Sequence, residues 1–267
     1  MLYNNKEHIS YSEVKEWHDC PFRHKLKYID GIDLFKSIPA IDFGTAVHSM
    51  CEHFLKTKEM DFEKYENKIN ELWEKYKDNP LYSESEKQKC NEHAKLIMNE
   101  IPNFMQENFG EWEFIACEEL LMEQIQENSD TKFKGFIDGV IKGKKLVRTK
   151  IKEYYWIIDW KTTSWGWAMS KKNDLMVKSQ IVLYKSFWST KNNIDIKDIK
   201  CGFVLLKKDA KDGNRCELVE ISAGEETIKK SLNILNSCIN GIKSGITMKK
   251  TYNCKYCAYD KTEHCVK

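Results

Sequence analysis

Four of the ten cysteines in this chain stand at its two ends. Cys20 lies in an Asp-Cys-Pro-Phe stretch near the start, whereas Cys254, Cys257 and Cys265 form a C-x2-C-x7-C pattern at the end. No residue near Cys20 could complete a metal site with it. If one metal centre binds all four thiols, the two ends of the chain are joined around everything between them.

Composition narrows the class of protein. A chain of 267 residues, with 31% charged and 41% hydrophobic residues, can bury a large core. It has no apolar run of about 18 residues and no apolar segment typical of a signal peptide, so we expect no membrane span and a cytoplasmic location. In a reducing compartment, clustered cysteines more often bind metal than form disulfides.

The charge pattern favours contacts that do not read base sequence, if the chain binds nucleic acid. The net charge is only +2, and three of the 43 basic residues are arginine. Lysine binds phosphate as a point charge and lacks the bidentate fork that recognises guanine. A coding sequence rich in A and T would produce the same bias toward lysine.

Hydrophobic periodicity predicts helices in the first part of the chain and strands in the second. Ser10 is a plausible helix cap, and Pro80 and Pro102 are expected to separate amphipathic helices. The predicted helices cover residues 10–30, 43–56, 60–109, 175–189 and 225–243. The predicted strands cover residues 112–125, 132–142, 145–151, 154–160 and 201–207.

This order predicts an α/β chain of the mixed α+β kind. A helical region comes first, a mixed sheet flanked by helices follows, and a cysteine-rich tail ends the chain. We expect one domain over residues 1–267, with a helical insert at about 57–110.

Two predicted strands carry acidic residues among apolar neighbours. Asp138 lies in a Gly-Phe-Ile-Asp stretch, and Asp159 lies in Ile-Ile-Asp-Trp-Lys, which ends at Lys161. Burying a carboxylate costs several kcal/mol unless a partner compensates it. Asp159 and Lys161 face the same side of a strand, where they could hold Mg²⁺ or Mn²⁺ and position a water for phosphodiester hydrolysis. The alternative is a buried Asp–Lys ion pair without a metal.

These motifs resemble the PD-(D/E)XK nuclease superfamily, specifically its RecB-like branch. The branch has a G-x-x-D strand followed by a D-x-K strand, as residues 135–138 and 159–161 are here. It also has a Q-x-x-x-Y helix, which Gln180 and Tyr184 match, and a histidine on an early helix after Gly-Thr, which His48 matches. The resemblance implies a restriction-endonuclease-like fold.

The resemblance also implies roles for individual residues. Asp138, Asp159, His48 and the Trp160 carbonyl would be ligands of Mg²⁺ or Mn²⁺. Lys161 would orient the attacking water or stabilise charge on the phosphate. Gln180 and Tyr184 would support the site or touch DNA. Glu118, which has Glu119 beside it, would be a further acidic ligand. The alternative for Glu118 is a solvated glutamate at a strand end.

The chain departs from the family pattern between its two aspartates. Asp138 and Asp159 are 21 positions apart, which is longer than the usual hairpin. The extra residues, 142–153, are rich in lysine. They could form a longer exposed hairpin or an arm that faces DNA.

The four cysteines resemble a subset of the same branch that carries a [4Fe–4S] cluster. This subset includes the AddB-type helicase–nuclease subunit and the small CRISPR-adaptation exonucleases. The resemblance implies that Cys20, Cys254, Cys257 and Cys265 hold the cluster. A tetrahedral Zn²⁺ site is the alternative, because thiolates suit both metals and His264 could replace Cys265.

Aromatic and basic residues follow the Asp-Trp-Lys motif closely. Trp165, Trp167, Lys171 and Lys172 could bind DNA, since exposed aromatic rings stack on unpaired bases of any sequence. Packing of at least one of these tryptophans against the helix that carries Gln180 is the alternative.

These observations together predict a metal-dependent deoxyribonuclease, an exonuclease acting on single-stranded or frayed DNA ends. The resemblance implies a prokaryotic or phage-encoded protein active in recombination, repair, phage DNA processing or CRISPR adaptation. The chain has no G-x4-G-K-[ST] motif, so a helicase, recombination or CRISPR-integration partner would have to supply ATP-driven steps. The alternative is a catalytically silent DNA-binding or assembly subunit with the same fold.

Overall fold

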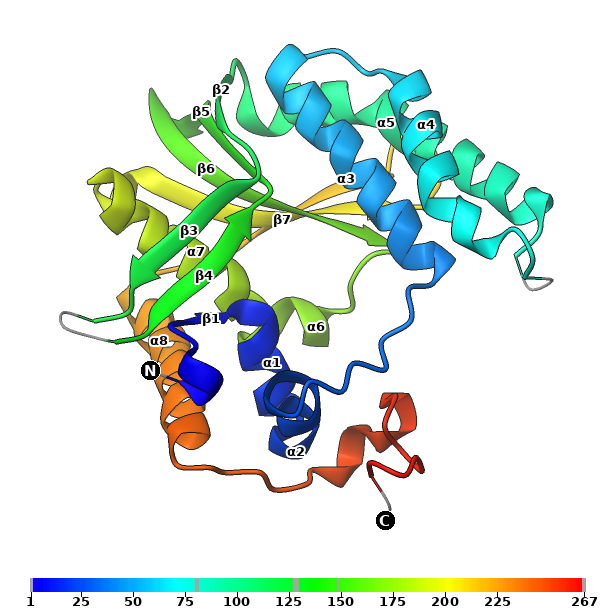
Figure 1. Cartoon of the computed structure of the whole chain (residues 1–267). Coiled ribbons are helices and arrows are strands. Elements are labelled where there is room, and N and C mark those ends of the chain that lie inside the picture. Colours follow the sequence, from blue (N-terminus) through cyan, green and yellow to red (C-terminus); the bar gives the residue numbers. More distant parts are fainter. Residues whose placement is uncertain (1, 80–81, 127–129, 148, 266–267) are drawn as a thin grey trace. The chain divides into compact units, whose positions relative to one another are not determined.

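The computed structural model describes residues 2–79, 82–126, 130–147 and 149–265 (Figure 1). The chain divides into two compact units, each built from separate stretches of sequence. Unit 1 comprises residues 1–36, 120–136 and 224–267, and unit 2 comprises residues 37–119 and 137–223. None of the described helices is long and apolar enough to span a membrane.

The described strands of unit 2 form a five-stranded mixed sheet in the order β2-β5-β6-β7-β8. Neighbouring strands are antiparallel except β6 and β7, which are parallel. The strands are β2 (Glu113–Ala116), β5 (Gly139–Val147), β6 (Lys150–Thr163), β7 (Ile199–Lys207) and β8 (Cys216–Glu220).

Helices cover both faces of this sheet. The main core lies on one face, where three helices pack against Trp156, Ile158 and Trp160 of β6. These helices are α3 (Pro39–Thr57), α4 (Phe62–Trp73) and α5 (Glu84–Phe109), and η3 (Glu74–Tyr76) extends α4. Helix α7 (Leu175–Asn192) contacts β6 and β7. It lies on the side of β6 that carries Asp159, opposite the core tryptophans. Two short helices, α6 (Met169–Asn173) and η4 (Ile196–Asp198), flank α7 in sequence.

Unit 1 contains a three-stranded sheet in the order β1-β4-β3. Two residues at strand ends, Glu119 and Ile137, are assigned to unit 2. Its strands are β1 (His8–Ser10), β3 (Glu119–Gln124) and β4 (Lys132–Ile137). Its helices are η1 (Tyr3–Asn5), α1 (Tyr11–Asp19), α2 (Pro21–His24), the π-helical η2 (Lys25–Ile29), α8 (Glu225–Lys243) and η5 (Thr251–Tyr256). As expected, Ser10 caps α1, accepting a hydrogen bond from the backbone N–H of Glu13.

The predicted mixed α/β fold is confirmed, but several predicted boundaries are wrong. The strand expected over residues 132–142 breaks at Asp138, so that β4 and β5 join different sheets. The strand expected over 112–125 is two strands, because Glu118 between them has a left-handed φ of 48°. Pro102 lies inside α5 and does not end it, since buried Ile101 and Met105 hold the helix against the core on both sides. Pro80 lies outside the described residues.

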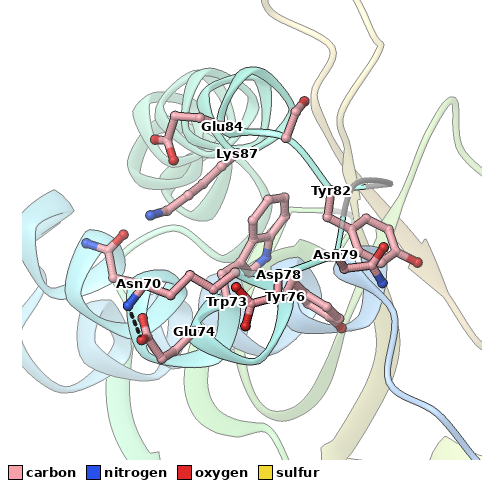
Figure 2. A pocket seen from close by; sticks show the side chains of 11 residues that line it. Asn70, Trp73, Glu74, Tyr76, Asp78, Asn79, Tyr82, Glu84 and Lys87 are labelled. Carbon is pink, nitrogen blue, oxygen red and sulfur yellow. Dashed lines mark hydrogen bonds and ion pairs between the residues drawn. The ribbon is translucent and has the colours of Figure 1, made fainter.

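The helical insert contains a cavity of about 600 Å³ (Figure 2). Its aromatic residues are Trp73, Tyr76 and Tyr82, and its rim mixes acidic residues with Lys77 and Lys87. Lys77 already pairs with Glu74. None of the residues that the motifs single out lines this cavity, so it is separate from the candidate active site.

Candidate active site and cysteine-lined cavity

Strand β6 carries the centre of the candidate site. Its side chains alternate, so Trp156, Ile158 and Trp160 enter the core while Asp159 and Lys161 face the other side of the strand. The Asp159 side chain is buried at 2% exposure, and its Oδ2 lies 2.5 Å from Nζ of Lys161. The predicted Asp-x-Lys pair is therefore a close ion pair in a mostly apolar strand.

Asp138 stands at the break between β4 and β5. Its Oδ2 accepts a hydrogen bond of 2.9 Å from the backbone N–H of Trp160. Gly139, the next residue, pairs with Ile158 in the β5–β6 ladder. The break in the strand thus brings the Asp138 carboxylate to the backbone of β6 between Asp159 and Lys161.

Helix α3 brings His48 to the same place. Gly44 on this helix approaches β6 so closely that a Cβ there would lie 3.1 Å from Oγ1 of Thr162. The glycine of the Gly-Thr motif therefore lets α3 pack close to the strand. One turn later, Nδ1 of His48 lies 3.5 Å from Oδ2 of Asp138.

Helix α7 completes the site from the face opposite the main core. The side-chain amide of Gln180 donates a hydrogen bond of 3.0 Å to Oδ1 of Asp159. The same nitrogen lies 3.5 Å from the hydroxyl of Tyr184, one turn further along the helix. Residues from α3, α7, β6 and the β4–β5 break therefore meet around Asp159.

Burial dominates the electrostatics of the site. It raises the pKa of both Asp138 and Asp159 to about 6, against the opposing charge of Lys161. It also lowers the pKa of His48 to about 4, so the imidazole is neutral at pH 7. Burial alone would lower the pKa of Lys161, but the charges of Asp159 and Asp138 raise it, so this lysine stays an ammonium ion.

This donor set fits a hard divalent cation. The Lys161 ammonium can offset only one of the two carboxylate charges, and a neutral imidazole is the form that binds metal. Asp138, Asp159 and His48 could serve as ligands. The Trp160 carbonyl, which accepts a hydrogen bond from His48, could be a further oxygen donor. Within the described ranges no three His, Cys, Asp or Glu side chains are arranged as a ready metal site, so binding a cation would require these side chains to move closer together.

Glu118 and Glu119 separate into different environments. The charge of Glu118 contributes to the raised pKa of Asp138, which places it near the site. Glu119 instead accepts a hydrogen bond of 2.8 Å from the Trp188 indole and pairs with Lys191. The left-handed φ of Glu118 turns the chain between the two residues.

Sequence reasoning missed Glu52. This residue lies on α3 one turn after His48, and its charge contributes to the raised pKa of Glu118. It also pairs with Lys56 at 2.6 Å. The spacing of four residues from His48 was the available signal, but a glutamate and a lysine four apart on a helix are common on solvated surfaces.

The two tryptophans that follow β6 lie in different environments. Trp165 is 74% exposed, whereas the Trp167 ring packs against Phe203 with 5.0 Å between centroids. Phe203 pairs with Asp159 in the β6–β7 ladder, so Trp167 is tied to the neighbourhood of the site. Nζ of Lys171 lies over the Trp167 ring, 4.5 Å from its centroid.

Lys172 also has a partner of its own. It pairs with Glu217, which pairs with Lys207 as well.

In unit 1, the four predicted cysteines line one cavity of about 430 Å³. They are Cys20, Cys254, Cys257 and Cys265, and the Cys20 sulfur accepts a hydrogen bond of 3.5 Å from the backbone N–H of Lys250. His264 does not line this cavity and lies beside Glu263. Four thiols around one space are a donor set that suits [4Fe–4S] or Zn²⁺.

A mixed sheet between helices, with two aspartates and a lysine meeting at its central strand β6, defines a restriction-endonuclease-like class of protein. The chain belongs to the PD-(D/E)XK nuclease superfamily, whose family model matches residues 8–262. It is also similar to the crystal structure of a protein from Eubacterium rectale described as a "Putative exonuclease". The TM-score is 0.57 at 13% identity, over 97% of this chain and 90% of that one. No curated protein matches the sequence significantly.

Proposed function

We propose that this chain is a divalent-metal-dependent DNA exonuclease of the RecB-like branch. The observation that carries the proposal is the meeting of His48, Asp138, Asp159 and Lys161 around one point of β6. Gln180 from α7 adds a hydrogen bond to Asp159, which supports assignment to the branch with a Q-x-x-x-Y helix. Membership of a nuclease superfamily supports the reaction type.

Asp138, Asp159 and His48 would hold Mg²⁺ or Mn²⁺, with the Trp160 carbonyl and Glu118 as further oxygen donors. Such a cation supplies Lewis-acid polarisation of the phosphate and lowers the pKa of a bound water. Gln180 keeps the Asp159 carboxylate in a fixed orientation through its hydrogen bond at Oδ1. Tyr184 keeps the Gln180 amide in place from one turn away.

Lys161 acts as a cation in this reaction and does not act as a general base. Its raised pKa keeps the ammonium protonated at neutral pH. In hydrolysis a water oxygen bonds to phosphorus, one P–O bond to the sugar breaks, and the leaving oxygen gains a proton. Negative charge grows on the phosphate during this exchange, and an ammonium ion at the site stabilises it.

The substrate we propose is single-stranded DNA or a frayed DNA end. Trp165 is exposed beyond the catalytic strand, and Lys171 and Lys172 follow on α6. Stacking on such an aromatic side chain tolerates every base, which suits an enzyme that digests any sequence. ATP-driven unwinding in recombination, repair, phage DNA processing or CRISPR adaptation would come from a partner.

The cysteine-lined cavity in unit 1 would hold a structural [4Fe–4S] cluster. Its support is the convergence of Cys20 with Cys254, Cys257 and Cys265 on one cavity, although they are far apart in sequence. Zn²⁺ is the competing occupant. Iron and acid-labile sulfide in anaerobically purified protein would establish the cluster, and stoichiometric zinc without colour would establish the alternative.

Closed circular DNA separates exonuclease from endonuclease action. Linear and circular single strands of the same sequence would be incubated with the protein and Mn²⁺. We expect the linear strand to be digested from its labelled end while the circle stays intact. Cleavage of both would overturn the exonuclease assignment, and cleavage of neither by folded protein would favour the silent DNA-binding subunit.

A further inference from the structure

The segment that leads to the last cysteines is entirely free of acidic residues. From Ser244 to Tyr259 the chain has no Asp or Glu, and it carries Lys249, Lys250 and Lys255. The chain as a whole has 43 basic and 41 acidic residues, so this local excess of positive charge differs from its average. A polyanion is the partner whose charge complements such a segment.

The same segment exposes two tyrosines. Tyr252 is 67% exposed and Tyr256 is 84% exposed, although both lie on η5 beside residues that face the cysteine-lined cavity. Cys254 and Cys257 line that cavity, and neither tyrosine does. The requirement that the cysteines turn inward therefore leaves the aromatic rings in solvent.

One lysine of the segment lies beside one of these rings, and two others lie near its start. Nζ of Lys255 lies 5.4 Å from the centroid of the Tyr256 ring. Lys249 and Lys250 line the cavity, and Lys250 donates a hydrogen bond of 2.6 Å to the carbonyl of His18. The hydrogen bond ties the start of the segment to α1, so the exposed tyrosines lie on an anchored piece of chain.

We propose that Lys249, Lys250, Tyr252, Lys255 and Tyr256, here called the tail surface, bind single-stranded DNA. Each tyrosine stacks on an unpaired base, and the lysines contact phosphates. Aromatic rings interleaved with lysines are the combination that binds single strands without sequence preference. The inference deepens the proposed function, because it adds a DNA contact in unit 1 to the catalytic residues of unit 2.

The test measures binding separately from cleavage. Anaerobically purified full-length protein would be titrated, in EDTA, into a fluorescent oligothymidylate and into an abasic oligonucleotide of equal length, both of about 16 nucleotides. The variants are Tyr252→Ala, Tyr256→Ala, Tyr256→Phe and Lys255→Gln. Phe114→Ala is the matched control, because Phe114 is an exposed aromatic residue beside Glu113.

Each Tyr→Ala change should weaken oligothymidylate binding about fivefold or more and leave abasic binding unchanged, since only stacking is lost. Tyr256→Phe and Phe114→Ala should bind like the wild type. Lys255→Gln should weaken binding to both oligonucleotides and reduce the salt dependence of log K by about 0.7.

Wild-type affinity in both Tyr→Ala variants would overturn the proposal, as would equal losses on the two oligonucleotides. Digestion assays in Mn²⁺ would run in parallel. If the protein digests DNA but the tail-surface variants bind like the wild type, this inference alone is refuted. If binding depends on the tail surface but the protein digests no DNA, the proposed nuclease function alone is refuted.

Discussion

At the scale of single residues, burial and the neighbouring side chains act in opposite directions on the pKa of Asp159. Its burial raises its pKa, whereas Lys161 at 2.5 Å and Gln180 at 3.0 Å favour or fix its ionised form. Burying a carboxylate in this way is costly unless positive charge compensates it, and Lys161 supplies one such charge. The Asp-x-Lys pair could be predicted from the sequence because alternation along a strand puts both residues on one side. Gln180 could be assigned only through the resemblance, since no local pattern connects it to β6.

The affinity for Mn²⁺ should depend on pH in one direction. Asp138 and Asp159 have pKa values of about 6 and bind a cation only when deprotonated, so affinity should fall as pH drops through about 6. His48, with a pKa of about 4, stays neutral through this range and does not limit binding. Isothermal titration calorimetry between pH 5 and pH 8 would measure the dependence. Constant affinity across that range would contradict the assigned ligands.

At the scale of elements, amphipathic periodicity predicted helices well and strand breaks poorly. Helix α8 begins at Glu225 and ends at Lys243, as its apolar spacing indicates. The break at Asp138 could not be predicted, because residues on both sides have the same β-prone, apolar pattern. At the end of β4, the Asp138 carboxylate accepts a hydrogen bond from the backbone N–H of Trp160, which is far away in sequence.

Replacing Gly241 by alanine should weaken the packing of α8 against α1. Alanine normally stabilises a helix interior by about 1 kcal/mol relative to glycine. Here a Cβ would lie 2.1 Å from Cζ2 of Trp17, a rigid ring that cannot yield as a flexible chain end would. We expect a net loss of about 2 kcal/mol in the free energy of unfolding, measured in urea.

Gly224→Ala is the control for this change, because nothing lies within 4 Å of a Cβ there and the only cost expected is that of alanine at the N-cap of α8, below about 1 kcal/mol. A Gly241→Ala protein as stable as the wild type would show that α1 and α8 do not pack as described.

At the scale of the whole molecule, unit 1 is assembled from three separate stretches of chain. Sequence patterns could not reveal this division, because nothing in composition changes at residues 36, 120 or 224. The cysteine pattern predicts that the two ends meet if one metal centre binds all four thiols, and the four cysteines line one cavity in unit 1. A cluster bound there would close a loop that contains all of unit 2.

Removing one of the four cysteines should reduce both the metal content and the stability of the protein. Cys20→Ser removes one proposed ligand, so we expect loss of the iron and of the brown absorption, and a melting temperature lower by several degrees. Iron analysis and thermal unfolding would measure these effects. Cys90→Ser is the control, because Cys90 is half-buried and does not line the cavity. Full iron content in the Cys20→Ser protein would exclude Cys20 as a ligand.

We propose that the residues around Asp159 hydrolyse DNA with a divalent metal. The most direct test compares wild-type and Lys161→Ala protein on end-labelled single-stranded DNA, in Mn²⁺ and in EDTA. We expect cleavage by the wild type only in Mn²⁺, and a rate at least about 100-fold lower in the variant. Circular dichroism would verify that both proteins are folded. Cleavage that persists in EDTA, or equal rates in the two proteins, would contradict the account.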